Sequence, residues 1–191
     1  ICKINLVVWS KFCNFANKTI YRMENQPQIQ DTLLKIHVKH SKPIDVNDFS
    51  AAMMAIGNLY SSFVKDNACC NYIPHSSLYV EKVEEGSLVV YLCEVMSGTV
   101  IPFLDGVNTI IEFAKFFKSA TDYWAHGKGE EPITNIQGCK DFSNIYGLIT
   151  GDNNGNVEIG AVNKNGDNFY ITHCTFNFSE ANSSQNRISK K

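Results

Sequence analysis

The sequence has no large excess of charge of either sign. Lys and Arg number 17 and Asp and Glu number 19, which gives a formal net charge of −2. Proteins that attract nucleic acid through its phosphates usually carry a basic patch or stripe. From this overall charge we expect no nucleic-acid partner.

Long apolar runs are missing as well. A helix that crosses a bilayer needs about 20 predominantly apolar residues. The most promising segment, near residues 107–126, is interrupted by Glu112, Lys115, Lys118 and Asp122. We therefore expect no membrane-spanning segment and no membrane partner.

Motifs that mark common catalytic and metal sites are also missing. The sequence contains no Gly-x-x-x-x-Gly-Lys-Ser/Thr loop for phosphates and no Gly-x-Ser-x-Gly turn for a nucleophilic serine. The seven cysteines are scattered without a Cys-x-x-Cys pair, and the adjacent Cys69 and Cys70 are poorly placed to bind one metal. This pattern predicts reduced thiols in a cytoplasmic protein, with no metal and no cofactor.

One acidic segment resembles the start of a calcium-binding loop. Asp152, Asn154, Asn156 and Glu158 alternate as oxygen ligands would, but the sixth and twelfth positions lack the glycine and glutamate of an EF-hand loop. Asn and Asp are also common turn residues, which explains the same pattern without a metal.

Two cysteine–histidine pairs could serve a hydrolase. Cys70 precedes His75, and His173 adjoins Cys174 in the C-terminal half of the chain. A nucleophilic thiol needs a histidine close in space, whereas neighbours on one strand point to opposite faces. We assign no catalytic residue, and enzymatic activity is the less favoured hypothesis.

The first part of the chain has clear periodicity. Residues 32–40 alternate as a half-buried strand with a basic outer face, and residues 47–63 have the spacing of an amphipathic helix. Residues 78–81 and 88–93 alternate around a turn at Glu85-Gly86, which predicts a hairpin. With a helix at 107–126, these elements predict an α+β fold: an antiparallel sheet with two helices in the order strand, helix, strand, strand, helix.

The helix at 107–126 has apolar residues over most of its circumference. A surface helix usually buries a stripe about 100° wide, and one hairpin cannot cover more than that. Either another element of the chain covers the remainder, or a second copy or a protein partner does. The expected association surface consists of Phe113, Phe116, Phe117 and Trp124.

Changes in composition divide the chain into three segments. The first methionine is Met23, so residues 1–22 are expected to be an upstream or non-native leader. Residues 23–130 form the α+β domain. Residues 131–191 form an Asn/Gly-rich appendage: a linker to Ile136, a short helix capped by Asp141, a small β-hairpin, and a C-terminal end that is either a helix start or a loose tail.

Three segments resemble an uncharacterised bacterial and prophage protein family. They are the run Val80–Val90 with its Glu-Glu-Gly-Ser-Leu-Val-Val turn, Asn108–Lys115 with Asn-Thr-Ile-Ile-Glu-Phe-Ala-Lys, and Glu180–Arg187. The resemblance spans Leu33 to Arg187 and implies relatedness in structure without any catalytic residues. It also implies that members have more chain after the last segment.

Two functions from different classes follow. The favoured one is a non-enzymatic, cytoplasmic interaction protein of bacterial or phage origin, which associates through the helix at 107–124 and the strand at 88–93. The alternative is a Cys/His-dependent hydrolase with its site in the C-terminal half. A pocket that brings a cysteine or carboxylate within hydrogen-bond reach of a histidine would favour the alternative.

Overall fold

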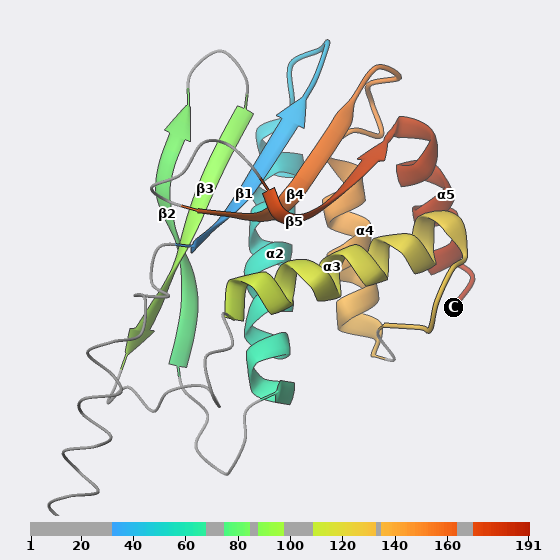
Figure 1. The fold of residues 1–191 in the computed structure, drawn as a ribbon. Helices are drawn as coiled ribbons and strands as arrows, with labels where there is room; N and C mark the ends of the chain where they lie inside the picture. The colour runs from blue at the N-terminus through green and yellow to red at the C-terminus, as the bar shows by residue number, and fades with distance from the viewer. Residues whose placement is uncertain (1–31, 68–74, 85–87, 98–108, 133–134, 164–169) are drawn as a thin grey trace, which may run out of the picture. The chain divides into compact units, whose positions relative to one another are not determined.

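The computed structural model describes residues 32–67, 75–84, 88–97, 109–132, 135–163 and 170–191 (Figure 1). Over these residues, five strands form one antiparallel sheet and four helices are interleaved with them along the chain. This is the expected α+β class. The elements are β1 (Thr32–Lys39), α2 (Val46–Asn67), β2 (His75–Glu84), β3 (Leu88–Ser97), α3 (Thr109–His126), α4 (Ile136–Gly147), β4 (Asn156–Asn163), β5 (Tyr170–Asn177) and α5 (Phe178–Ile188).

Strand β1 occupies the centre of the sheet. The strand order is β2-β3-β1-β4-β5, and each neighbouring pair is antiparallel. Leu34 of β1 lies opposite Leu92 of β3 on one side and Ala161 of β4 on the other. Because side chains alternate along a strand, Leu34, Ile36 and Val38 share one face, and the lysines and histidine of β1 share the other.

The segment 131–191, expected as an appendage, completes this sheet. Strand β4 pairs with β1 along its whole length, from Asn156 opposite Lys39 to Asn163 opposite Thr32. Residues Asp31–Lys191 form one compact unit. The sheet therefore extends across the boundary expected near residue 130, because a buried central strand needs a hydrogen-bonded neighbour on each side.

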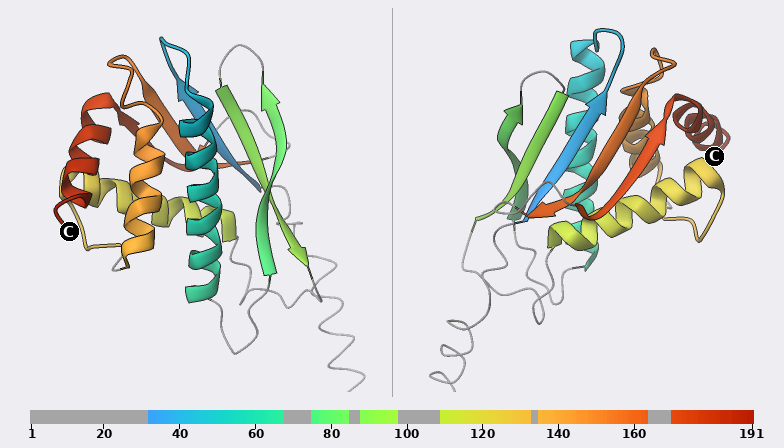
Figure 2. Two further views of the ribbon diagram at one scale, coloured as in Figure 1. Left: turned by 180° about the vertical axis from the view of Figure 1, so that it is seen from behind. Right: turned by 45° about the horizontal axis from the view of Figure 1, so that its top comes forward.

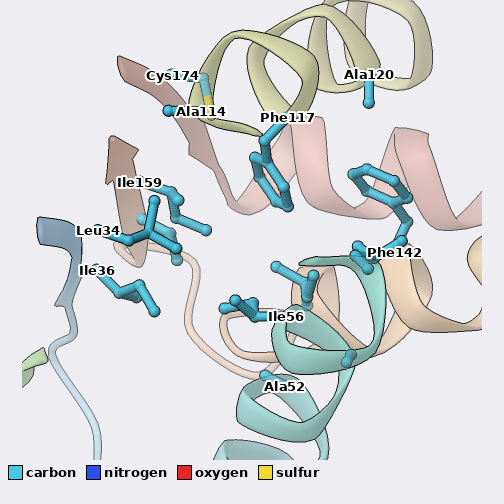
Figure 3. Close-up of a cluster of buried hydrophobic side chains, with 14 of the residues drawn as sticks. Leu34, Ile36, Ala52, Ile56, Ala114, Phe117, Ala120, Phe142, Ile159 and Cys174 are labelled. Atoms are coloured by element: carbon cyan, nitrogen blue, oxygen red, sulfur yellow. The ribbon is translucent and has the colours of Figure 1, made fainter. Parts of the chain in front are cut away.

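The helices cover one face of the sheet. Figure 1 views the sheet from the side away from α2 and α4, and the view from behind in Figure 2 shows these helices in front of the strands. Helix α3 packs against β5, β4 and β1, and α5 packs against α3 and α4. Strand and helix side chains meet in one core that includes Leu34, Ile36, Ile56, Phe117 and Phe142 (Figure 3).

Helix boundaries show where local sequence signals succeed and fail. Asp45 Oδ1 accepts a hydrogen bond from Asn47 N at 2.7 Å, so it caps the first turn of α2. Helix α4 begins earlier than the expected start at Asp141, because Asn135 Oδ1 accepts a hydrogen bond from Gly138 N at 2.6 Å. The end of the expected linker is thus a helix cap and a first helical turn.

The C-terminal end is a helix, and the loose-tail alternative is wrong. Asn177 Oδ1 accepts a hydrogen bond from Glu180 N at 3.1 Å, and Glu180 Oε2 accepts one from Asn177 N at 2.9 Å. This reciprocal pair is a capping box, which satisfies backbone groups that the first turn leaves unpaired. Ala181, Ser184 and Ile188 of α5 are buried.

Some sequence expectations fall outside the described residues. These are the leader at 1–22, Cys69 and Cys70, and the turn at Glu85-Gly86. In the part of the chain that is described, no helix combines the length and the apolar character needed to cross a membrane.

Candidate functional site

The four residues expected to form an association surface lie in or against the chain's own core. Phe113 and Phe117 are 0% exposed and Trp124 is 2% exposed, while Phe116 is half-buried. Phe117 stacks on Phe142 of α4 with 5.1 Å between ring centroids (Figure 3). The apolar arc of α3 is therefore packed inside the fold.

Helix α2 covers the flank of α3 that α4 does not. The ring of Phe63 lies 5.6 Å from that of Phe113 and 5.4 Å from that of Phe116, and the ring of Tyr60 lies 5.1 Å from that of Phe113. The hairpin alone could not cover these rings, but α2 and α4 together do. We do not place a binding site here, and self-association itself stays a prediction.

The cysteines of the C-terminal half do not form an activated nucleophile. Cys174 points into the core, where Thr121 Oγ1 lies 3.8 Å from its sulfur, while His173 lies on the opposite face of the sheet. Burial raises the pKa of the Cys174 thiol to about 12, and burial also raises the pKa of Cys139. Thiolate is the reactive form, so neither thiol is prepared for attack.

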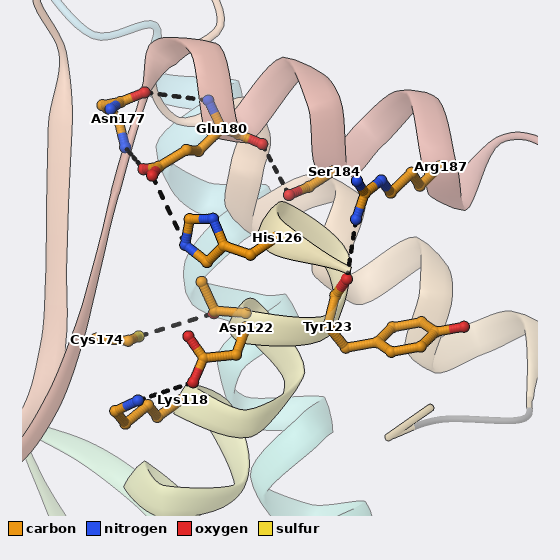
Figure 4. Close-up of polar contacts among 10 residues, drawn as sticks. Lys118, Asp122, Tyr123, His126, Cys174, Asn177, Glu180, Ser184 and Arg187 are labelled. Atoms are coloured by element: carbon orange, nitrogen blue, oxygen red, sulfur yellow. Dashed lines mark hydrogen bonds and ion pairs between the residues drawn. The ribbon is translucent and has the colours of Figure 1, made fainter. Parts of the chain in front are cut away.

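Polar side chains near Cys174 hold α5 against α3 (Figure 4). His126 Nε2 lies 3.7 Å from Glu180 Oε1, and Arg187 Nη1 donates a hydrogen bond to the Tyr123 carbonyl at 3.2 Å. Glu180 is also the capping residue of α5. These groups join two helices and bring no cysteine within reach of a histidine.

The calcium-like residues do not converge. The Asp152 carboxylate accepts hydrogen bonds from Ser41 Oγ at 2.6 Å, Ser41 N at 2.5 Å and Asn154 N at 3.0 Å. The two hydrogen bonds from Ser41 hold the pKa of Asp152 down to about 2, and the bond from the hydroxyl has a larger effect than the bond from the backbone N–H. Asp152 therefore fastens a turn, and the described residues contain no group of three or more His, Cys, Asp or Glu side chains suited to a metal.

The sheet face opposite the helices has a cluster of its own. Leu33, Val89, Tyr91 and Val162 are buried there, and no described helix contributes a side chain to the cluster. We call this surface the open face. Its residues, as the register sets them, are Leu33, Lys35, His37, Lys39, Tyr79, Lys82, Glu84, Val89, Tyr91, Cys93, Asn156, Glu158, Gly160, Val162, Tyr170, His173 and Thr175.

Cations and rings alternate across the open face. Lys82 Nζ lies 5.8 Å from the Tyr91 ring centroid, and Lys35 Nζ lies 5.6 Å from the same ring and 5.5 Å from that of Tyr170. The Tyr170 ring stacks on His173 at 4.6 Å between centroids. We call these five residues the cation–ring row. Its spacings are those of cation–π contacts, which stabilise an ammonium group against a ring face.

A bulge in each edge strand places these residues on one face. The register of β2 shifts between Val80 and Lys82, so Tyr79 and Lys82 both face the open side. The register of β5 shifts opposite Ala161 and Val162, which does the same for Tyr170 and His173. Residues three apart on a regular strand point to opposite faces, and one inserted residue brings them together.

Gly160 allows β5 to approach β4 closely within the row. Gly160 lies opposite His173, and a Cβ at Gly160 would lie only 2.5 Å from the His173 Cβ. Any side chain here would therefore push β5 outward. The glycine leaves room on the open face beside Lys35, its neighbour on β1.

Glu158 is the acidic centre beside the row. Lys39 Nζ lies 2.5 Å from Glu158 Oε1, while His37 Nδ1 lies 3.4 Å from Oε2, and the Tyr170 hydroxyl donates to Oε2 at 3.3 Å. Burial alone raises the pKa of this carboxyl, but the Lys39 bond and the charges of Lys39 and His37 outweigh it and hold the pKa below its usual value. Glu158 thus stays ionised at neutral pH.

The tyrosines of the row stay protonated. Burial, followed by the Glu158 charge, raises the pKa of Tyr170, and burial followed by Glu84 raises that of Tyr91. The hydrogen bond from Lys82, at 3.0 Å, lowers the pKa of Glu84. Each of these shifts moves a pKa further from 7, whereas general acids and bases work best with a pKa near the working pH. Glu84, Tyr91 and Tyr170 are therefore poorly suited to general acid or base catalysis.

Sequence reasoning found only part of this site. The basic positions of β1 were recognised, but Lys35 was expected to meet water and is only 9% exposed, with rings from β3 and β5 beside it. Glu158 was considered only as a calcium ligand. Tyr170 and Tyr91 had no signal that linked them to Lys35, since only the strand order brings them together.

The fold and the open face give no lead to a relative. Comparison of the chain with models of protein families, with characterised proteins and with solved structures finds no match.

Proposed function

We propose that this protein is a non-enzymatic binding protein that takes an anionic partner on the open face of its sheet. The observation that supports the proposal is a pair of exposed lysines, Lys82 at 62% and Lys39 at 53%, on a sheet face that no described helix covers. The centre of the cation–ring row, Lys35 and Tyr91, is buried. This proposal keeps the expected class, an interaction protein, and moves the contact surface from α3 to the sheet.

Charge supports an anionic partner. The open face has three lysines, Lys35, Lys39 and Lys82, against two glutamates, Glu84 and Glu158. The whole chain has a net charge of −2, so this face is more positive than the chain as a whole. Complementary charge mainly increases the rate and selectivity of association.

A matched pair of lysines allows a direct test. Lys82 on the open face is 62% exposed and pairs with Glu84, and Lys115 on α3 is 57% exposed and pairs with Glu112. We would titrate the full chain into fluorescent anionic probes: poly-glutamate, inorganic polyphosphate, a thymidine oligonucleotide, and an abasic oligomer of equal length. At least one probe should bind, Lys82→Glu should weaken it, and Lys115→Glu should not. Failure of all probes, or equal effects of both variants, would refute the proposal.

A further inference from the structure

We infer that Asn154 is a site of spontaneous deamidation, and that the contact between Ser41 and Asp152 controls how fast it reacts. Asn154 and Gly155 lie in the turn between α4 and β4, where Asn154 is exposed and Gly155 is buried. Deamidation is favoured where glycine follows asparagine, because glycine has no side chain to hinder the approach of its backbone nitrogen. This reaction needs no partner and is independent of the proposed binding function.

The only co-reactant is water. The backbone nitrogen of Gly155 attacks the side-chain carbonyl carbon of Asn154, Cγ, and forms a new N–C bond. The Cγ–Nδ2 bond breaks, and ammonia leaves with the proton that the Gly155 nitrogen loses. Water then opens the cyclic imide at either of its carbonyl groups, which gives aspartate or isoaspartate at residue 154.

The native turn restrains the attacking nitrogen. Gly155 N donates a hydrogen bond to the Asp152 carbonyl at 2.8 Å, so the group that must attack Asn154 is engaged elsewhere. Gly155 is also closely packed, since a Cβ at this position would lie 2.8 Å from the Ile149 Cβ. Attack on Asn154 therefore requires the turn to open first.

The Asp152 carboxylate fastens this turn to a distant part of the chain. It accepts hydrogen bonds from Asn154 N at 3.0 Å, within the turn, and from Ser41 Oγ at 2.6 Å, in the segment between β1 and α2. Lys42 Nζ donates a further hydrogen bond to the Gly151 carbonyl at 3.1 Å. Opening of the turn thus requires these contacts to loosen, and the segment after β1 controls the reaction at Asn154.

The reaction would disturb the packing of the turn. Isoaspartate lengthens the backbone by a methylene group, and either product adds a carboxylate two residues from that of Asp152. The Gly155 carbonyl accepts a hydrogen bond from the backbone N of Phe178, the first residue of α5, at 3.3 Å. A shift of Gly155 would therefore reach the start of α5.

Peptide mapping measures the reaction at each asparagine. The full chain would be kept in mildly alkaline buffer, folded or in guanidinium, and then digested for mass analysis of aspartate and isoaspartate. In guanidinium, Asn154 should react as fast as Asn165, which also precedes glycine, and faster than Asn153, which precedes asparagine. In the folded chain, Asn154 should react at least about 10-fold more slowly than in guanidinium, because only the opened turn reacts.

Ser41→Ala tests the contact, and Ser61→Ala is its control. Ser41→Ala removes the hydroxyl bond to the Asp152 carboxylate. A hydrogen bond to a charged group changes an equilibrium by about 10-fold or more, so the reaction at Asn154 in the folded variant should accelerate by about that factor. Ser61→Ala removes a hydroxyl that donates to the Gly57 carbonyl at 2.9 Å within α2, and it should leave the rate unchanged. Melting curves would confirm that both variants are folded.

Several results would overturn the inference. In guanidinium, an Asn154 that reacts no faster than Asn153 would remove the site. Equal rates at Asn154 in the folded and unfolded chain, equal rates in Ser41→Ala and the unmutated chain, or equal acceleration by Ser61→Ala would remove the control by Ser41 and Asp152. The comparison of the folded and unfolded chain needs no variant, so it decides the matter even if Ser41→Ala does not fold.

Discussion

Gly160 of β4 lies directly opposite His173 of β5, at a separation that leaves no room for a side chain on Gly160. The Cβ that alanine would add lies 2.5 Å from the His173 Cβ, between β4 and the edge strand β5. The position of the Tyr170–His173 stack thus depends on the absence of one methyl group.

Gly160→Ala should therefore destabilise the fold and displace β5. Overpacking of this kind costs about 1–3 kcal/mol, which lowers Tm by roughly 2–4 °C per kcal/mol for a chain of this size. Thermal melting followed by circular dichroism measures it.

Gly57→Ala is the matched control for that experiment. A Cβ at Gly57, within α2, meets no atom within 4 Å. Alanine should stabilise a helix interior by about 0.5–1 kcal/mol. An equal fall in Tm for both variants would show that the close contact at β5 is not the cause.

The hydrogen bonds of Asp152 should make stability depend on acid pH. The folded pKa of about 2 lies below the ordinary value of 3.8, so the stabilising effect is complete above about pH 4 and is lost as the pH falls toward 2. Tm of the unmutated chain and of Asp152→Asn would be compared across this range. The difference should shrink as the pH falls, and a constant difference would contradict the prediction.

Phe117→Ala should act through the fold of the single chain. Phe117 is fully buried, so its truncation should cost about 3–5 kcal/mol. If the aromatic side of α3 is covered from within the chain, Tm should not depend on protein concentration. Melting at concentrations about a hundredfold apart checks this. A Tm that rises with concentration would indicate that these residues contact a second copy of the chain.

Cys174 should resist alkylation in the folded protein. Its pKa of about 12 leaves almost no thiolate at neutral pH, and its side chain is buried. Mass analysis of the peptide that contains Cys174, after brief iodoacetamide treatment with and without guanidinium, measures the reaction at this residue. Rapid modification without denaturant would contradict this prediction and would favour the alternative of a Cys/His-dependent hydrolase.

Local patterns in the sequence predicted most elements but not their assembly. Alternation identified β1, and the spacing of apolar residues identified α2 and α3, since both depend only on near neighbours. The pairing of Gly160 with Lys35 could not be predicted, because the register between β1 and β4 depends on the packing of the whole sheet. The segment after residue 130 was therefore separated from the sheet that it completes.

The site was less predictable than the fold. Its two bulges change which residues face outward, and a bulge leaves no clear mark in a strand sequence: Glu81 and Ile171 are ordinary strand residues. Lys35 illustrates the result, because its alternation with Leu34 and Ile36 correctly predicted its face but not the rings that cover it.

The central place of β1 also determines how the chain can fold. The hairpins β2-β3 and β4-β5 join strands that are neighbours in sequence, so each can form early and locally. Strand β1 gains its second neighbour only when β4, which follows α2, β2, β3, α3 and α4 in the chain, pairs with it. Closure of the sheet thus depends on a pairing between strands that are far apart in the sequence, and such non-local contacts are expected to slow folding.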